Sequence, residues 1–444
     1  MTVLHYTIGL PPTRMGGSVQ YAYDLMMEQA KTANVIALTC GETLFRSNIS
    51  KIKYHYKNEN VQVYNLTNPL TPTLIYGTRN PSSQYRDIKI DYQNIRQFII
   101  SNEVRILHLH TLMGLHSNLV KYIKELGVKI IYTTHDFHGI CPHYNFINEN
   151  GEICDTPSSK KCTLCNQKEP SDFFLRIANS SLYHFLKSHS LIPNNRNNST
   201  AIRKASTHLL ENKKYQDFDK LINYYKDYFR LIDKFHFNSS QTRDKFEAIL
   251  GRLNGDVIPV ITKGINDKRM PLQKHNKSIL GFIGGIGDYK GFPTLKNILI
   301  DLNLAGINNI KLKVYGTPFR GVDNECKLIE YCGKYKYSDI SEIMYGLDAT
   351  IVPSKWYETF SLVTLESLAH GRPAIISDHV GAKDIVSKYN PNFIFNSSTE
   401  LKSLLLKISD NPSILTQENH KILSNPWKLS IESHTNDIFS FYEF

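Results

Sequence analysis

Several features that would assign a chain to a membrane or to secretion are missing from these 444 residues. There is no run of about 18 apolar residues, so no transmembrane helix is expected. The N-terminus, Met1 to Tyr6, lacks the basic region and the long apolar run of a signal peptide. The seven cysteines of a chain without a signal peptide indicate a reducing cytoplasm rather than a disulfide framework. We therefore expect a cytoplasmic protein.

A dense basic block and a nucleic-acid-binding motif are also missing. Lys and Arg total 52 against 41 Asp and Glu, which gives a formal net charge of +11. The excess is spread along the chain and is typical of an ordinary solvated surface, so no nucleic-acid partner is expected. A nucleic-acid-binding protein is the alternative that charge alone suggests. The same excess can attract phosphorylated substrates or an anionic membrane surface.

What the chain does have is an alternation of strand-like and helix-like segments in two series. At 444 residues it is too long for one ordinary core. The alternation predicts two doubly wound, Rossmann-like α/β domains with parallel sheets and with ligands at the carboxyl ends of the strands. The strands expected in the first series are 3–8, 34–38, 61–64, 105–110, 129–133, 234–240 and 257–262, and those in the second are 278–283, 311–315, 349–352 and 373–377.

The domain boundaries are expected where the composition changes. The N-terminal domain covers 1–263 and includes a cysteine-rich loop at 141–165 and an aromatic, basic region at 169–234, which we interpret as a helical insertion. A polar, turn-rich segment at 264–277 is typical of a linker. The C-terminal domain covers 278–425, and 426–444 is expected to form a helix that packs back on the N-terminal domain.

Two glutamates, Glu358 and Glu366, flank the start of a helix predicted to follow the strand at 349–352. The backbone N–H groups of residues 360–363 lack intrahelical partners there and attract anions. Carboxylates accept hydrogen bonds from sugar hydroxyls, so this arrangement suits a sugar joined to a diphosphate. The alternative is a pair of solvated acids favoured by the helix dipole.

The glutamates lie in a longer pattern, Asp348-Ala-Thr-Ile-Val-Pro-Ser354 followed by Glu358 to Glu366 and His370-Gly-Arg-Pro373. This pattern resembles the family-4 retaining glycosyltransferases, which have the GT-B fold. The resemblance runs from about Leu4 to about Tyr442 and is weakest between about Asn166 and Tyr228. It implies an interdomain cleft, an acceptor side on the N-terminal domain, a nucleotide-sugar donor side on the C-terminal domain, and no cofactor required for catalysis.

The resemblance also implies roles for single residues. Glu366 matches the glutamate that binds the donor ribose, and Glu358 matches a catalytic residue near the hydroxyls of the transferred sugar. The backbone of Phe360, Ser361 and Leu362 would contact the sugar and the diphosphate. Tyr335, at the end of Tyr331-Cys-Gly-Lys-Tyr335, lies in the segment that reads the nucleotide base in the family; the alternative is an ordinary loop.

A glycine-rich loop, Leu280 to Gly291, resembles the strand–loop–helix in which the family places an arginine and a lysine on the diphosphate. Lys290 matches the lysine and is expected to be catalytic and donor-binding. Gly285 stands at the arginine position, so a guanidinium fork on the phosphates is missing. Arg14, Lys263 or Lys355 can supply a replacement cation. The alternatives for the loop are a tight turn or, less well matched, a dinucleotide-binding loop.

In the first domain, Gly16 and Gly17 end a loop that resembles the family's diglycine loop before a helix, where the backbone approaches donor phosphates or acceptor. An ordinary turn is the alternative. His135 matches the strand-end histidine that contacts the transferred sugar, and Asp136 is expected to orient it or to cap a helix. His108 and His110 lie two apart on a strand and face the same side. We expect these two to be structural or to line the acceptor site rather than to bind metal, because no third ligand is evident.

Four cysteines fall within a short stretch: Cys141, Cys154, Cys162 and Cys165. The last two form a C-x-x-C pair, and four thiols in a reducing compartment suit a tetrahedral structural zinc site. Free thiols or a redox pair are the alternative.

The resemblance to family-4 glycosyltransferases implies a retaining, metal-independent hexosyltransferase. The expected donor is a UDP- or GDP-sugar, and the acceptor is a glycan or a lipid-linked glycan in polysaccharide or glycoconjugate synthesis. A catalytically inactive GT-B subunit that stabilises an active partner is the main alternative, and Gly285 supports it. Residues 172–187 can form an amphipathic helix for peripheral contact with the inner face of the membrane, although such helices more often pack on their own domain.

Overall fold

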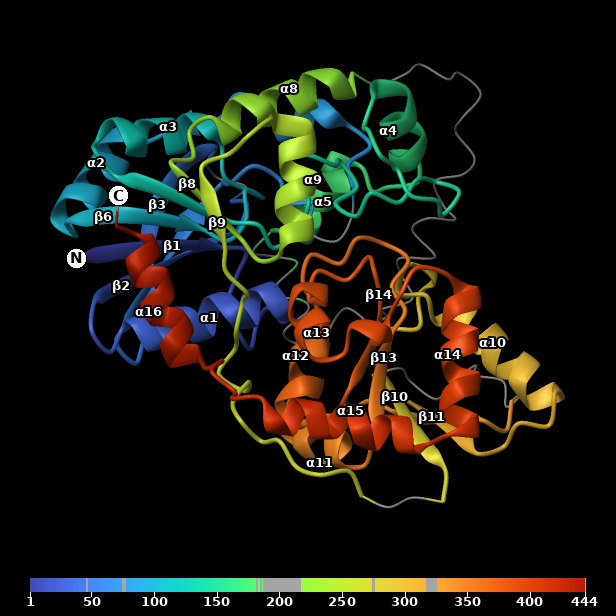
Figure 1. The fold of residues 1–444 in the computed structure, drawn as a ribbon. Coiled ribbons are helices and arrows are strands. Elements are labelled where there is room, and N and C mark those ends of the chain that lie inside the picture. The colour runs from blue at the N-terminus through green and yellow to red at the C-terminus, as the bar shows by residue number, and fades with distance from the viewer. Residues whose placement is uncertain are drawn as a thin grey trace. The chain divides into compact units, whose positions relative to one another are not determined.

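The computed structural model describes residues 1–44, 47–73, 77–180, 183, 186, 217–273, 276–316 and 326–443. The chain forms two compact units, each built around one sheet (Figure 1). Unit 1 comprises Met1–Asn238, Arg243–Ile258 and Thr435–Phe444, and unit 2 comprises Ser239–Thr242 and Pro259–His434. Among the described helices, none is both long enough and apolar enough to span a membrane.

The sheet of unit 1 has the strand order β5-β3-β4-β2-β1-β6-β7-β8-β9. Its central strand β1 is buried along its whole length, as expected for a parallel strand covered on both faces. The strands are β1 (Thr2–Thr7), β2 (Asn34–Cys40), β3 (Ile49–Asn58), β4 (Val61–Thr67), β5 (Lys89–Ile90), β6 (Val104–Leu109), β7 (Lys129–Thr133), β8 (Lys234–Phe237) and β9 (Gly255–Val257).

Two features of this sheet correct the expectation from the sequence. The sheet is not wholly parallel, because β3 and β4 pair antiparallel. Only two residues separate them, and such a short connection permits a hairpin but no crossover. The last strand ends at Val257 instead of extending over 257–262, since Pro259 has no N–H to donate to a neighbouring strand.

The described helices that accompany this sheet include one, α1, that begins directly after the diglycine loop. The predicted helical region at 169–234 contains α5 and α8, while 187–216 lies outside the described residues. The helices are α1 (Gly17–Gln29), α2 (Tyr92–Ser101), α3 (Ser117–Glu125), α4 (Ser159–Asn166), α5 (Asp172–Ala178), α8 (Phe218–Phe229), α9 (Ser240–Leu250) and α16 (Ile431–Phe441), with a 3₁₀ turn η1 (Pro81–Gln84).

The sheet of unit 2 is parallel throughout, in the order β12-β11-β10-β13-β14-β15. The chain direction along the sheet reverses between β10 and β13, and ligands of doubly wound sheets bind at the carboxyl ends of the strands at such a point. The strands are β10 (Ser278–Ile283), β11 (Ile310–Tyr315), β12 (Ile329–Gly333), β13 (Ala349–Val352), β14 (Ala374–Ser377) and β15 (Ile394–Phe395). The helices are α10 (Phe292–Leu304), α11 (Ile340–Tyr345), α12 (Leu362–Ala369), α13 (Lys383–Tyr389), α14 (Ser398–Asp410) and α15 (Ser413–Ser424), with 3₁₀ turns η2 (Asp288–Lys290), η3 (Tyr337–Asp339) and η4 (Pro391–Phe393).

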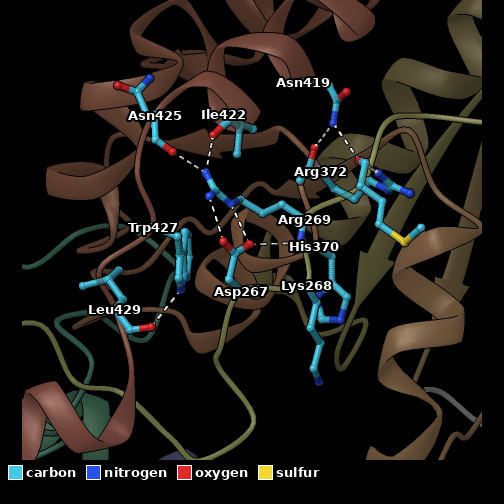
Figure 2. Close-up of polar contacts among 12 residues, drawn as sticks. Asp267, Lys268, Arg269, His370, Arg372, Asn419, Ile422, Asn425, Trp427 and Leu429 are labelled. Atoms are coloured by element: carbon cyan, nitrogen blue, oxygen red, sulfur yellow. Dashed lines mark hydrogen bonds and ion pairs between the residues drawn. The ribbon is translucent and has the colours of Figure 1, made fainter.

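The chain entering unit 2 is held in place by two arginines (Figure 2). Arg269 pairs with Asp267 and donates to the carbonyls of Ile422 and Asn425 at the end of α15. Arg372, only 1% exposed, donates to the carbonyls of Met344 and Met270. The segment expected to be a linker is therefore partly bound to unit 2, and the arginine of the His370-to-Pro373 motif has a structural role.

Candidate functional site

In unit 2 the loops after β10 and β13 bring together two residues that the sequence analysis selected. Lys290 Nζ lies 2.9 Å from Glu358 Oε1, and the two side chains are 26% and 15% exposed. The second carboxylate oxygen, Glu358 Oε2, accepts a hydrogen bond of 2.6 Å from Ser354 Oγ. Lys290 also lies 5.2 Å from the ring centre of Trp356. The ion pair fixes a cation at the topological switch point of the sheet.

The glycines of the β10 loop differ in what they permit. At Gly291, which has φ of 73°, an added Cβ would collide with the backbone carbonyl of Pro353, so the loops after β10 and β13 approach closely only because glycine is there. At Gly285 an added Cβ would meet nothing within 4 Å. The missing arginine is therefore not excluded by space.

The start of α12 carries the donor-binding residues predicted after β13. Ser361, the residue before the helix, has φ of 93° and makes no side-chain cap, so the first N–H groups of α12 are left to other acceptors. Phe360 is 4% exposed and Leu362 begins the helix. One turn further on, Glu366 is 6% exposed. Burial raises the pKa of its carboxyl to about 7, against a hydrogen bond from Tyr337 and the charge of Lys268, which lower it.

Tyr335 lies beyond the end of β12, and Tyr331 to Gly333 belong to this strand, so the alternative that the whole segment Tyr331 to Tyr335 is an ordinary loop is wrong. Its ring packs edge-on against Tyr315 at 6.4 Å between centroids. Both tyrosines line an open groove of about 830 Å³, together with Lys313 and Lys334.

In unit 1, Gly16 and Gly17 stand at the start of α1, directly after the loop that follows β1. Gly16 has φ of 151°, and an added Cβ there would meet nothing within 4 Å, which leaves the backbone open to close approach. His135 follows β7, is half-buried, and packs edge-on against Tyr21 at 5.0 Å between ring centroids. Asp136 accepts from the N–H of His138 at 2.9 Å and so caps this turn.

His108 and His110 face the same side of β6, as predicted, with ring centroids 4.3 Å apart. The sequence analysis missed their neighbours. His5 on β1 is in register with His108, and its Nδ1 lies 2.9 Å from His110 Nε2. His135 Nε2 lies 3.3 Å from His110 Nδ1. The available signal was a histidine within, or just after, each of the predicted central strands.

His5, His108 and His110 hold ligand nitrogens that all lie within 4.8 Å of one another. Within the described part of the chain, this is the only group of three His, Cys, Asp or Glu residues that meets this criterion. The stated reason against metal, that no third ligand is evident, is therefore wrong.

The four cysteines lie in one neighbourhood of unit 1, although no three of their sulfurs come within 4.8 Å of one another. Burial raises the pKa of the Cys162 thiol well above its usual range, and the Cys141, Cys165 and Cys154 sulfurs add to this effect. Burial likewise raises the pKa of Cys165 to about 12. Burial also raises the pKa of the Cys141 thiol, and the backbone N–H groups of Phe146, His143 and Asn145 partly oppose this effect because they favour the thiolate.

Comparison with known proteins gives a family match for part of unit 2 and a match of the fold for nearly the whole chain. Residues 265–424 match the family of glycosyl transferases group 1. An uncharacterized 42.6 kDa protein from the cps region of Klebsiella pneumoniae is 22% identical over 332 residues, which cover 71% of this chain and 70% of that protein.

Solved structures share the fold over nearly the whole chain. Sucrose-phosphate synthase from Thermosynechococcus elongatus superposes with a TM-score of 0.57 at 12% identity, covering 99% of this chain and 98% of that one. Anabaena HepE in complex with UDP gives a TM-score of 0.53 at 13% identity, with 99% of each chain covered. The chain therefore has the GT-B fold of two Rossmann-like domains, and its residues 265–424 are a glycosyl transferases group 1 domain.

Proposed function

We propose that this protein is a retaining glycosyltransferase that moves a sugar from a UDP- or GDP-sugar to a glycan or lipid-linked glycan acceptor. The observation that carries the proposal is the Lys290–Glu358 ion pair beside the uncapped start of α12, with Glu366 buried one turn on. A cation and helix N–H groups suit a diphosphate, and two carboxylates suit sugar and ribose hydroxyls. The relative from a cps region supports a role in polysaccharide synthesis.

In the proposed reaction the acceptor hydroxyl attacks the anomeric carbon from the face that the diphosphate leaves. A diphosphate oxygen takes the hydroxyl proton, so no protein nucleophile and no metal are required. Lys290 and the N–H groups at the start of α12 stabilise charge on the leaving group. Glu358 keeps Lys290 in place and contacts the sugar hydroxyls, while Glu366 accepts from the ribose and His135 contacts the transferred sugar.

The test is a panel of nucleotide sugars that begins with UDP-glucose, the ligand in one of the HepE structures. Binding is measured by thermal stabilisation, and chemistry by release of the nucleotide with and without glycan acceptors. We expect one base to stabilise the protein and its sugar conjugate to be turned over. Binding without hydrolysis or transfer for any donor would contradict the proposed activity.

A catalytically inactive subunit is the second candidate, and Gly285 is the observation that favours it. Without the arginine, Lys290 must meet the diphosphate with fewer donors than the family uses. The two candidates differ in turnover by the isolated chain. They also differ in whether adding a partner transferase is needed before any product forms.

We also propose that Cys141, Cys154, Cys162 and Cys165 hold a structural zinc ion. Three kinds of observation support it: the four thiols lie close enough to affect one another's pKa, backbone N–H groups near Cys141 favour its thiolate against the effect of burial, and all four cysteines are without disulfides. Zinc binds thiolates tetrahedrally, and N–H donors to sulfur orient such ligands. The ion would tie together a loop with little regular structure, 141–158, and α4.

Peripheral membrane contact is proposed for α5, whose Phe173 is 73% exposed and whose Phe174 and Ile177 are 36% and 38% exposed. Arg176 on the same helix adds a positive charge. Co-sedimentation with vesicles that contain anionic lipid tests this contact, and Phe173→Ser should reduce it. Equal sedimentation of the variant would refute a role for α5.

A further inference from the structure

Unit 1 contains a continuous chain of buried hydrogen bonds that connects five histidines. Its members come from β1, α1, β6, β7, β8 and the C-terminal end of the protein. His5, His108 and His236 are 0% exposed, and His110 is 3% exposed. This chain of hydrogen bonds ends at His135, the residue proposed to contact the transferred sugar. Every contact in it lies within unit 1.

One end of the chain is a backbone carbonyl, which can only accept. The carbonyl of Ile258 lies 2.7 Å from His236 Nε2, so this nitrogen carries the proton. In a neutral ring His236 Nδ1 is then unprotonated and accepts from Thr133 Oγ1 at 2.9 Å. The Thr133 oxygen in turn accepts from His108 Nε2 at 2.6 Å. His108 Nδ1 is left to accept from the Tyr442 hydroxyl at 2.7 Å.

The same order of donor and acceptor continues to the other end of the hydrogen-bond chain, and no bond in it is left with two donors or two acceptors. Because the Tyr442 hydroxyl donates to His108, its oxygen accepts from Gln29 Nε2 at 3.2 Å. The Gln29 amide oxygen therefore faces His5 and accepts from Nε2 at 2.8 Å. His5 Nδ1 then accepts from His110 Nε2 at 2.9 Å. His110 Nδ1 finally accepts from His135 Nε2 at 3.3 Å.

The assignment requires neutral rings, and the surroundings favour them. Burial lowers the pKa of His5 and His236 to about 4 and that of His135 to about 3. Burial and the neighbouring histidines lower the pKa of His110 well below its usual range. Burial also keeps the Tyr442 hydroxyl protonated by raising its pKa. A charge on any ring of His5, His108, His110 or His135 would lie 4.3 to 5.5 Å from a neighbouring histidine ring, measured between centroids.

We propose that this chain is a positioning device that fixes His135 as the neutral Nε2–H tautomer, with Nδ1 as a hydrogen-bond acceptor. His135 would then take part as an acceptor from a sugar hydroxyl, and a protonated, donor form would be excluded. Thr133 and Tyr442 are positioning residues. Each hydroxyl accepts one hydrogen bond of the chain and donates the next, and neither is proposed to touch the substrate. The inference deepens the proposed function and rests on it for the role of His135, but the tautomer can be measured without any activity.

A metal at His5, His108 and His110 is the competing interpretation of the same cluster. The hydrogen-bond chain already uses both ring nitrogens of all three residues. A metal bound to one nitrogen of each residue would have to displace at least two of these bonds, and its binding would change the tautomers. The two interpretations therefore predict different nitrogen spectra.

The experiment uses the full chain labelled with ¹⁵N at histidine. Long-range ¹H–¹⁵N correlation spectra distinguish the two neutral tautomers and the imidazolium, and single His→Gln variants assign the signals. We expect His5, His108, His110, His135 and His236 all to be Nε2–H at pH 7. Metal analysis of the same sample should find no ion that is lost on His5→Gln substitution.

Two pairs of variants separate direction from packing. Tyr442→Phe removes the hydroxyl that connects the two halves of the chain, and Thr133→Val removes the link to the Ile258 carbonyl. Thr133→Ser keeps that link. Tyr6→Phe is the matched control, because the Tyr6 hydroxyl is also buried in the sheet but donates to the carbonyl of Met113, outside the chain.

The expected result is a mixed or reversed tautomer at His135 in Tyr442→Phe and Thr133→Val, and an unchanged one in Thr133→Ser and Tyr6→Phe. With a donor that the enzyme turns over, kcat should fall about tenfold in Tyr442→Phe and Thr133→Val, as expected for one lost hydrogen bond. In Thr133→Ser and Tyr6→Phe it should fall less than about twofold. A His135 that is Nδ1–H or charged at pH 7, or unaffected by both substitutions, would overturn the proposal. If the tautomers are as predicted but the protein has no transferase activity, the proposed function is refuted and the proposed hydrogen-bond chain is not.

Discussion

The two units treat buried polar groups in opposite ways. In unit 2 the selected groups are charged and meet in an ion pair, Lys290 with Glu358, while Glu366 is a buried acid whose pKa is raised to about 7. In unit 1 the corresponding groups are histidines linked by hydrogen bonds, directly or through Thr133, Tyr442 and Gln29, and burial lowers the pKa of four of them, His5, His110, His135 and His236. In the proposed site, unit 2 therefore supplies charged side chains, and unit 1 supplies neutral side chains whose donors and acceptors are oriented.

This difference determines which substitutions are informative. Removing a charge in unit 2 changes the electrostatic stabilisation of a leaving diphosphate directly. Removing a hydroxyl in unit 1 leaves all charges in place and changes only the direction of donors and acceptors. The expected effects decrease in that order.

The largest effect is expected from Lys290→Ala. Loss of the cation at the switch point should lower kcat by about 10²–10³, the range for removal of one preorganised stabilising group. Steady-state release of the nucleotide measures it. Lys402→Ala is the matched control, because Lys402 also forms a lysine–acid pair of 2.8 Å in unit 2, with Asp301, away from the β10 loop. Equal loss in both variants would remove Lys290 from the proposed mechanism.

Glu366→Ala should weaken nucleotide binding by about 10- to 100-fold, since a hydrogen bond to a charged group contributes about 1.5–3 kcal/mol. The wild type should also bind more weakly as the pH falls through about 7, because protonation removes the carboxylate that accepts from the ribose. Glu366→Gln should lose this pH dependence. Calorimetric titration from pH 5.5 to 8.5 checks both points, and a pH profile shared by wild type and Glu366→Gln would contradict them.

Gly285→Arg tests whether the missing guanidinium limits the enzyme. There is open space at this position, so the fold should tolerate the side chain. A second phosphate-binding cation should raise kcat or donor affinity about tenfold, the value of roughly one charge-assisted bond. Gly285→Met provides similar bulk without the charge. A gain in both variants, or in neither, would show that the absent charge is not what limits turnover.

The smallest effect on catalysis is expected from the proposed zinc site, because it lies in a loop and supplies no reacting group. Protein purified under reducing conditions should contain about one zinc per chain. Its removal by a chelator should lower the melting temperature by several degrees and make the cysteines of the site reactive to a thiol reagent. Cys326→Ala, a buried cysteine of unit 2, is the control. Metal-free protein with the same melting temperature would refute the site.

Much of unit 2 could be predicted from sequence because its signals are local. The strands at 278–283 and 349–352 were predicted with the bounds that the structure has. A continuous apolar run followed by glycine or proline defines a buried parallel strand well. Strand β12 was missed because it lies at the edge of the sheet, where four of its five residues are only partly buried and the apolar pattern is weak. β3 was missed because most of its residues are exposed, which again leaves a weak apolar pattern.

The candidate site likewise has a part that local sequence motifs predict and a part that depends on residues far apart in the sequence. The pairing of Lys290 with Glu358 agrees with a pattern that lies in two short motifs, each on one strand–loop–helix unit. The histidine chain could not be predicted, because residues that bond directly to one another are separated by up to 413 positions and meet only when the strands take their register. Gln29 and Tyr442 carry no motif, and each looks like an ordinary helix residue until its partners are known.

The sequence by itself determined the α/β class and most of the elements, since hydrophobic periodicity and turn residues act over a few positions, and a local motif selected the residues around Glu358 and Glu366. Only the tertiary structure decided which nitrogen of each histidine carries a proton. That choice depends on a carbonyl at Ile258, eight hydrogen bonds away from His135 along the chain of contacts. A buried donor must find an acceptor, and in this unit that requirement is met only by residues that folding brings together.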